Sequence, residues 1–302
     1  MNIAVFFKLI RYKNLLLIIY TLTLINFVFF KAFNISENLS NFQFLLLLMA
    51  IVAITAAGYI INDIFDVVAD EVNKPSKVIV GKKISVEKAQ KLYFFINSFG
   101  IITGVIFSLN LKKPEVSFYF FTIALLLYFY SKKLKSVVLL GNFIVSCVIA
   151  VNFIFYGCIA VNTTVLNEYN SLIINTLIAL AIFAFLLNFA REILKDIEDI
   201  KGDKKLNMNT LPILIGRKRA LFITAVFCTV SLLFLVWIML NFSEDFKFTM
   251  LYLLIMVFLP LLYVAIQFFK ISSLKKIHSL STFLKIIMFL GISGLLIFSL
   301  KI

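Results

Sequence analysis

Residues 58–77, GYIINDIFDVVADEVNKPSK, follow a run of about 20 apolar residues, enough to cross a bilayer. Asp63, Asp66 and Asp70 stand here at i, i+3 and i+7, a spacing that predicts three carboxylates on one face of a helix over two turns. A carboxylate in the hydrocarbon costs about 2.5–3.5 kcal/mol even on a lenient insertion scale, and like charges at this spacing repel each other. We therefore expect cations to neutralise this stripe.

A second acidic window has the same spacing. Residues 191–205 read REILKDIEDIKGDKK, in which Asp196, Asp199 and Asp203 again stand at i, i+3 and i+7. The two windows together hold nine of the fifteen Asp and Glu residues of the chain. Each follows an even-numbered apolar run, so both are predicted to lie on the same side of the membrane. One such window would be typical of a solvated loop, but the repeated spacing favours a shared site.

The composition predicts an integral membrane protein. The chain has 302 residues, is 62% hydrophobic and has a mean hydropathy of +1.05, whereas soluble domains are about 45–50% apolar. Because the apolar pattern continues to the last residues, an N-terminal signal peptide does not explain it. We expect one polytopic domain over residues 1–302, an all-α bundle of nine transmembrane helices around a central cavity. The expected spans are 15–33, 42–61, 92–111, 115–130, 137–160, 172–194, 220–240, 248–269 and 283–300.

The distribution of basic residues predicts the orientation. All but five of the 29 Lys and Arg fall on the side that holds the N-terminus and both acidic windows. Because cytoplasmic loops are enriched in Lys and Arg, we expect the N-terminus and the active-site loops to be cytoplasmic. The net charge of +14 is then explained by these loops, which would face anionic membrane lipid or an anionic substrate, and we expect no nucleic-acid partner. The sequence does not indicate the oligomeric state.

The chemistry of the two stripes indicates a magnesium site. Oxygen ligands without His or Cys suit a hard cation. Mg²⁺ binds through one or two carboxylates together with water and substrate phosphate oxygens. Two stripes on one side of a bundle therefore predict Mg²⁺ ions that bridge the aspartates to a diphosphate. Cationic side chains near the stripes would supply further contacts to the diphosphate, and the candidates are Lys74, Arg191, Arg11, Lys135 and Lys195.

Read together, these motifs resemble the UbiA superfamily of intramembrane prenyltransferases. NDIFDVVADEVNKPSK is similar to its first motif, Asn-Asp-x-x-Asp-x-x-x-Asp followed by Asn-Arg-Pro, and KDIEDIKGDKK is similar to its second, Asp-x-x-Asp-x-x-x-Asp. RYKN at 11–14 and YSKKLK at 130–135 resemble two further family motifs, and LLGN at 139–142 is also similar. Two departures are that Lys74 replaces an Arg and Tyr12 replaces a Pro. The resemblance spans essentially the whole chain.

The resemblance implies a fold of nine helices and a function, Mg²⁺-dependent transfer of a prenyl group from a prenyl diphosphate to a lipophilic acceptor within the membrane. It implies the following metal ligands: Asn62, Asp63, Asp66, Asp70, Asp196, Asp199 and Asp203. Of the aspartates, Asp66, Asp70, Asp199 and Asp203 are the expected catalytic ones. Tyr130, at the end of the fourth span, is a candidate for stabilising an allyl cation with its ring face, since aromatic faces attract cations. A Tyr at this place is also typical of an interfacial anchor.

The acceptor is the least determined part of the prediction. REILKDIEDIKGDKK most resembles the branch that acts on geranylgeranylglyceryl phosphate. The alternative is an aromatic acceptor of quinone biosynthesis, of the 4-hydroxybenzoate or dihydroxynaphthoate type. A function of a different class, an ion-coupled transporter, is raised by acids within membrane-spanning segments. It is disfavoured because both clusters lie at one face and helix-breaking prolines are scarce.

Overall fold

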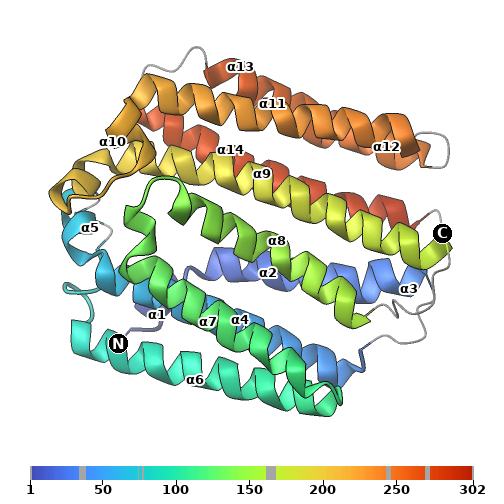
Figure 1. The fold of residues 1–302 in the computed structure, drawn as a ribbon, viewed down its shortest axis with the longest axis horizontal. Coiled ribbons are helices and arrows are strands. Elements are labelled where there is room, and N and C mark those ends of the chain that lie inside the picture. The colour runs from blue at the N-terminus through green and yellow to red at the C-terminus, as the bar shows by residue number, and fades with distance from the viewer. Residues whose placement is uncertain are drawn as a thin grey trace. The chain divides into compact units, whose positions relative to one another are not determined.

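The structure is a computed structural model that describes residues 2–33, 39–73, 75–76, 78–160, 168–242, 246–268 and 273–300. Within these ranges the chain is helical, and extended pairing is limited to one isolated bridge between Val80 and Ile84. Nine helical segments of the described chain are long and apolar enough to cross a membrane. The expectation of an all-α membrane protein with nine spans is therefore confirmed. Figure 1 shows the course of the chain.

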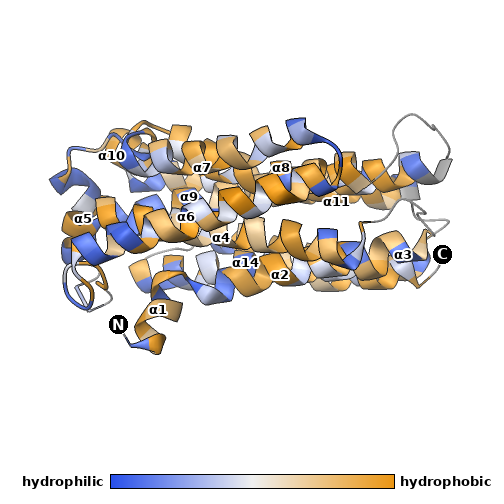
Figure 2. Ribbon diagram, turned by 90° about the horizontal axis from the view of Figure 1, so that it is seen from below, coloured by the Kyte–Doolittle hydropathy of each residue, from blue (hydrophilic) through white to orange (hydrophobic). Residues whose placement is uncertain are grey.

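The helices follow one another with few long connections. They are α1 (Ile3–Leu9), α2 (Tyr12–Leu24), η1 (Ile25–Phe29), α3 (Phe30–Ala32), α4 (Asn41–Phe65), α5 (Val67–Asn73), α6 (Val86–Asn110), η2 (Pro114–Val116), α7 (Ser117–Lys132), η3 (Leu134–Ser136), α8 (Leu140–Ala160), α9 (Glu168–Lys205), α10 (Leu211–Ile215), α11 (Arg217–Phe242), α12 (Lys247–Leu253), η4 (Leu254–Phe258), α13 (Leu259–Gln267) and α14 (Leu274–Ser299). Hydrophobic residues cover helices such as α6, α7 and α11 along most of their length, and hydrophilic residues gather near helix ends, as at α5 (Figure 2).

Local sequence explains where several spans begin. Ser40 and Gln43 form a capping box at the start of α4, in which each side chain bonds the backbone amide of the other. Ser85 caps α6 and Ser273 caps α14 by accepting from the amide three residues later. In the eighth span, Pro260 lies in the first turn of α13, directly after the π-helical turn η4. Proline has no amide hydrogen to donate, which accounts for the irregular turn before it.

The described chain forms two compact units. Unit 1 comprises Met1–Thr23, Leu39–Gly141 and Lys201–Asn209, and unit 2 comprises Leu24–Asn38, Asn142–Ile200 and Thr210–Ile302. In unit 1, α4, α6 and α7 pack against one another. Glycines allow this close approach: a Cβ at Gly104 on α6 would lie 2.5 Å from the ring of Phe120 on α7. In unit 2, α14 packs against η1, α12, η4 and α13.

Candidate active site

The first aspartate stripe lies in unit 1 at a break between two helices. α4 ends at Phe65, Asp66 has φ −93° and ψ 3°, and α5 begins at Val67. The expectation of a single helix through this stripe is thus corrected. Backbone bonds nevertheless continue across the break, since Asp66 N donates to Asn62 O at 2.9 Å and Asp70 N donates to Asp66 O at 2.8 Å. Asp63 therefore belongs to α4, and Asp70 to α5.

Lys135, which comes from a different motif, contacts Asp66 of this stripe. Asn62 Nδ2 donates to Asp66 Oδ2 at 2.8 Å. Lys135 Nζ donates to Asn62 Oδ1 at 3.3 Å and forms an ion pair with Asp66 Oδ1. Gly141 permits this placement of η3, because a Cβ there would lie 2.8 Å from Lys135 Cα. Asn62, Asp66 and Lys135, all expected from the sequence, are thus brought together.

Arg11 and Asp63 form the second ion pair of this region. Arg11 Nη2 lies 2.8 Å from Asp63 Oδ1, and the guanidinium lies 4.9 Å from the ring centre of Tyr59. Asn14 Nδ2 donates to the Tyr59 hydroxyl at 3.2 Å. Burial alone would lower the pKa of Arg11, but Asp63, Tyr59 and Asp66 together outweigh this effect and leave the pKa above its ordinary value. Arg11 also has a φ of 50°, a conformation that few residues other than glycine adopt.

The second aspartate stripe lies on one continuous helix. α9 runs from Glu168 to Lys205, so it extends eleven residues beyond the expected end of the sixth span at 194. In unit 2, Asn142 Nδ2 donates to Asp196 Oδ2 at 2.8 Å. Asn142 is only 7% exposed and lies in the first turns of α8. This pair fixes one oxygen of Asp196.

Arg191 and Lys195 both contact Glu192, a residue that was not among the predicted site residues. Both form ion pairs with Oε1 of Glu192, which is buried. The contacts are local to α9, so the side chains are placed before any substrate binds. Their role toward a diphosphate stays a prediction.

The ends of the two motifs meet within unit 1. Gly202 N, on α9, donates to Asn73 Oδ1, on α5, at 2.7 Å. No larger residue fits at Gly202, because a Cβ there would lie 2.3 Å from Asn73 Nδ2 and 2.7 Å from Ala69 O. Asp203, the next residue, is buried. The contact therefore holds the final aspartate of the second motif beside the end of the first.

The other predicted residues are Tyr130, Asp199 and Lys74. Tyr130 is half-buried at the end of α7, where its ring would contact a Cβ at Gly141 at 3.4 Å. Asp199 lies on α9 between Asp196 and Asp203. Lys74 lies outside the described residues, so its predicted contact with the diphosphate stays a prediction.

The donor set at Asn62 and Asp66 fits a magnesium ion. Within the described ranges, no three His, Cys, Asp or Glu residues gather closely enough to hold a metal ion. Asp66 and Asp63 are instead paired with Lys135 and Arg11. However, the Lys135 ammonium already lies between an amide oxygen and a carboxylate oxygen, the two oxygen types that a hard cation prefers. A cation is thus accommodated at these oxygens.

The predicted site residues did not include three polar partners, Tyr59, Asn73 and Asn142, although Asn73 and Asn142 lie within motifs quoted from the sequence. Each contacts a motif residue named from the sequence, or its neighbour in the chain. The available signal was their position, since each is a polar residue in or beside an apolar span next to an acidic or basic motif. Pairing them required knowledge of which helices are neighbours, and the spacing within one motif does not provide it.

Comparison with known proteins agrees with this picture. The family model of the UbiA prenyltransferase family matches residues 15–291. A digeranylgeranylglyceryl phosphate synthase of Saccharolobus solfataricus is 34% identical over 257 residues, covering 84% of this chain and 85% of that protein. The enzyme of the same name from Pyrococcus furiosus is 40% identical over 173 residues, 57% of this chain and only 56% of that protein.

Solved structures give the same fold. A structure of digeranylgeranylglyceryl phosphate synthase in membranes superposes with a TM-score of 0.64 at 25% identity, covering 99% of both chains. A UbiA homologue from Archaeoglobus fulgidus, bound to DMAPP and Mg²⁺, superposes with a TM-score of 0.59 at 16% identity over 96% of this chain and 98% of that one. The expected family is confirmed, and it favours an enzyme over a transporter. The chain belongs to the UbiA prenyltransferase family and is a multi-pass membrane prenyltransferase.

Proposed function

We propose that this enzyme transfers a geranylgeranyl group from geranylgeranyl diphosphate to the free glycerol hydroxyl of geranylgeranylglyceryl phosphate. The observation that carries the proposal is the likeness to digeranylgeranylglyceryl phosphate synthases, which extends over 84% of the chain at 34% identity. The name of these relatives supports this acceptor, because addition of a second geranylgeranyl group to geranylgeranylglyceryl phosphate requires a glycerol oxygen that is still free.

In the proposed reaction the allylic C–O bond of the donor breaks and its electron pair leaves with the diphosphate. A new C–O bond forms to the acceptor hydroxyl, whose proton passes to water or to the released diphosphate. The diphosphate gains negative charge as it departs, so cations placed beside it lower the barrier. Lys135 and Arg11 form ion pairs with aspartates of the first stripe and supply such charge. The ring of Tyr130 is proposed to face the developing allyl cation.

Magnesium fits the same scheme. Asn62, Asp63, Asp66 and Asp70 would hold it from the first motif, and Asp196, Asp199 and Asp203 from the second. Bound there, Mg²⁺ would act as a Lewis acid on the leaving diphosphate. Asn142 keeps one oxygen of Asp196 in a fixed direction, as ligand carboxylates commonly require. The hydrogen bond from Gly202 to Asn73 joins the second motif to the end of the first.

The charge of the chain favours a phosphate-bearing acceptor. The donor carries a diphosphate and the proposed acceptor a phosphate, so both substrates bring anionic groups to one membrane face. The net charge of +14, with all but five of the 29 Lys and Arg on the predicted cytoplasmic side, suits two anionic head groups better than one. We propose that this side carries the active site.

The decisive experiment is a transfer assay with the full-length enzyme in membranes. Geranylgeranyl diphosphate and Mg²⁺ are offered with geranylgeranylglyceryl phosphate, 4-hydroxybenzoate or dihydroxynaphthoate, and products are identified by mass spectrometry. Digeranylgeranylglyceryl phosphate should form with the first acceptor, with release of diphosphate. Product with an aromatic acceptor alone would replace the proposal by a role in quinone biosynthesis.

A further inference from the structure

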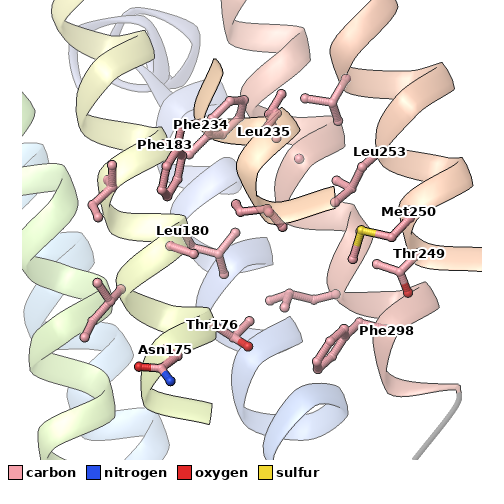
Figure 3. A pocket seen from close by; sticks show the side chains of 18 of the residues that line it. Asn175, Thr176, Leu180, Phe183, Phe234, Leu235, Thr249, Met250, Leu253 and Phe298 are labelled. Carbon is pink, nitrogen blue, oxygen red and sulfur yellow. The ribbon is translucent and has the colours of Figure 1, made fainter. Parts of the chain in front are cut away.

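An apolar pocket of about 360 Å³ lies within unit 2, and its size is that of a ligand site. Side chains of α9, α11, α12, η4 and α14 line it. Figure 3 shows Phe183 and Phe234 near one end of the pocket, and Asn175, Thr176 and Thr249 toward the other.

The pocket is remote from the aspartates of α9. Phe183 is its lining residue nearest to Asp196 along that helix. Their separation of thirteen positions corresponds to about 20 Å of helix. Thr176 is twenty residues from Asp196, or about 30 Å, the thickness of a bilayer core. The pocket thus belongs to the half of the membrane opposite the second motif.

The depth of the pocket matches one leaflet. On α9 the lining runs from Leu172 to Phe183, about 16 Å along the helix axis. On α12 and η4 it runs from Thr249 to Val257, about 12 Å. Half of a typical hydrocarbon core is about 15 Å. Trp237 lies in the lining near the end of α11, and Trp is enriched at membrane–water boundaries. The polar end of the pocket therefore lies at the boundary.

One polar group at this boundary end lacks a partner. Thr176 donates to Leu172 O at 2.7 Å, and Asn175 Nδ2 donates to Ser171 Oγ at 3.4 Å. Thr249 is only 4% exposed, yet its hydroxyl makes no hydrogen bond to any described residue. It lies in the first turn of α12, which begins at Lys247. A buried hydroxyl without a partner is unfavourable, so an occupant with an oxygen near Thr249 would stabilise it.

We propose that this pocket binds one hydrocarbon chain of a bilayer lipid, with the glycerol oxygens of that lipid at Thr249. The glycerol region of a lipid lies at the edge of the hydrocarbon, which is where Thr249 and Trp237 are placed. None of the described lining residues is Lys, Arg, Asp or Glu. A prenyl diphosphate head group in this pocket would therefore lack a cation beside it, which argues against the pocket as the site of the donor's diphosphate.

Trp237 is the only tryptophan of the chain and reports on this pocket directly. The full-length protein in detergent micelles is titrated with a phospholipid that carries bromine atoms on one chain, and quenching of Trp237 fluorescence is measured. We expect a saturable component at about one lipid per protein. Gly294→Leu should remove it, because a side chain at Gly294 grows beside Leu253, a lining residue.

Two further variants and one competitor complete the test. Ile286→Phe, on the exposed surface of α14, is the matched control and should leave the saturable component unchanged. Thr249→Val keeps the shape but removes the hydroxyl, and should weaken binding about two- to tenfold; it also serves if Gly294→Leu does not fold. Quenching that rises without saturation and equally in all variants would mean surface lipid only and would overturn the proposal. Displacement of the brominated lipid by geranylgeranyl diphosphate with Mg²⁺ would overturn it too, by assigning the pocket to the donor.

Discussion

The ammonium of Lys135 forms an ion pair with the carboxylate of Asp66 and also bonds Asn62 Oδ1 at 3.3 Å. Asp66 and Asn62 are proposed metal ligands, so a lysine of the same enzyme holds the oxygens that Mg²⁺ would need. If Mg²⁺ binds there as proposed, Lys135 and Mg²⁺ would compete for Asp66. On binding of the metal and the donor, Lys135 would be free to turn to the diphosphate, where its charge would stabilise the leaving group.

Replacing Lys135 should separate metal binding from catalysis. In Lys135→Gln the competing charge is absent, so Mg²⁺ without donor should bind about tenfold more tightly, the equivalent of one charged hydrogen bond. Turnover with saturating Mg²⁺ should nevertheless fall about tenfold or more, because the cation beside the diphosphate is lost. Calorimetry without donor measures the first effect, and a transfer assay measures the second.

The control for this experiment is Lys132→Gln. Lys132 is exposed at the end of α7, and its ammonium lies 5.7 Å from the ring centre of Tyr128, with no contact to Asp66. It should change neither quantity. If Lys135→Gln binds Mg²⁺ as the parent does and keeps its turnover, the proposed exchange of partners is wrong.

Both aspartate motifs should be required for activity. Asp66→Ala and Asp203→Ala each remove one proposed ligand, and each should lower turnover at least about a hundredfold. The amount of protein in the membrane should remain similar, which immunoblotting checks. Chelation of Mg²⁺ by EDTA should abolish transfer in the parent, and full activity in EDTA would contradict the whole metal scheme.

The fold was largely predictable because the length and hydropathy of the apolar runs determine it. Apolar runs of about 20 residues must form helices in a membrane, since every backbone polar group needs an internal partner there. The ends were less predictable. Nothing in the sequence near Asp66 indicates that α4 ends there, and α9 continues through KDIEDIKGDKK although the apolar run stops at 194. A helix outside the hydrocarbon is not distinguished from a loop by hydropathy.

The candidate site was predictable as a set of residues but not as a set of contacts. The repeated i, i+3, i+7 spacing identified the aspartates, because it is a property of each motif alone. The pairs Arg11–Asp63, Lys135–Asp66 and Asn142–Asp196 join residues 52 to 69 positions apart. Which cation meets which carboxylate depends on helix packing, and a single sequence does not encode this in any local pattern.

The contact between Gly202 and Asn73 should make an important contribution to stability. Gly202→Ala places a Cβ 2.3 Å from Asn73 Nδ2, so the helices must shift, and the free energy of unfolding should fall by about 1–3 kcal/mol. Asn73→Ala leaves the Gly202 amide without its partner and should cost a similar amount. Because the two residues are in contact, the double variant should lose less than the sum. Thermal unfolding measures each value.

Gly294→Ala is the matched control here, since its Cβ would meet no atom closer than 3.4 Å. It should change the free energy of unfolding much less than Gly202→Ala does. Equal effects of the two substitutions would show that replacing any helical glycine lowers the free energy of unfolding. The contact between α5 and α9 would then make no particular contribution to stability.

The orientation in the membrane is tested with single cysteines. Cys147, Cys158 and Cys228 are first replaced by Ala, since Cys158 is exposed. A cysteine at 168, at the start of α9, should then react in intact cells with a thiol reagent that does not cross membranes. A cysteine at Glu87, in the exposed first turn of α6, should react only after the cells are opened. The reverse pattern would place the active-site loops outside the cytoplasm.

Lys74, which stands where the family motif has Arg, should contact the donor alone. Lys74→Ala removes a charged hydrogen bond worth about 1.5–3 kcal/mol, so kcat/KM should fall roughly tenfold to a hundredfold. Lys74→Arg should retain or improve activity, because a guanidinium binds phosphate through two bonds. Since the contact is to the donor, the loss should be the same with every acceptor, and inhibition by inorganic diphosphate should weaken in parallel. Lys83→Ala, at an exposed lysine of the same loop, is the control and should leave both quantities unchanged. If Lys74→Ala also leaves both unchanged, this lysine serves only as a positive charge that orients the chain.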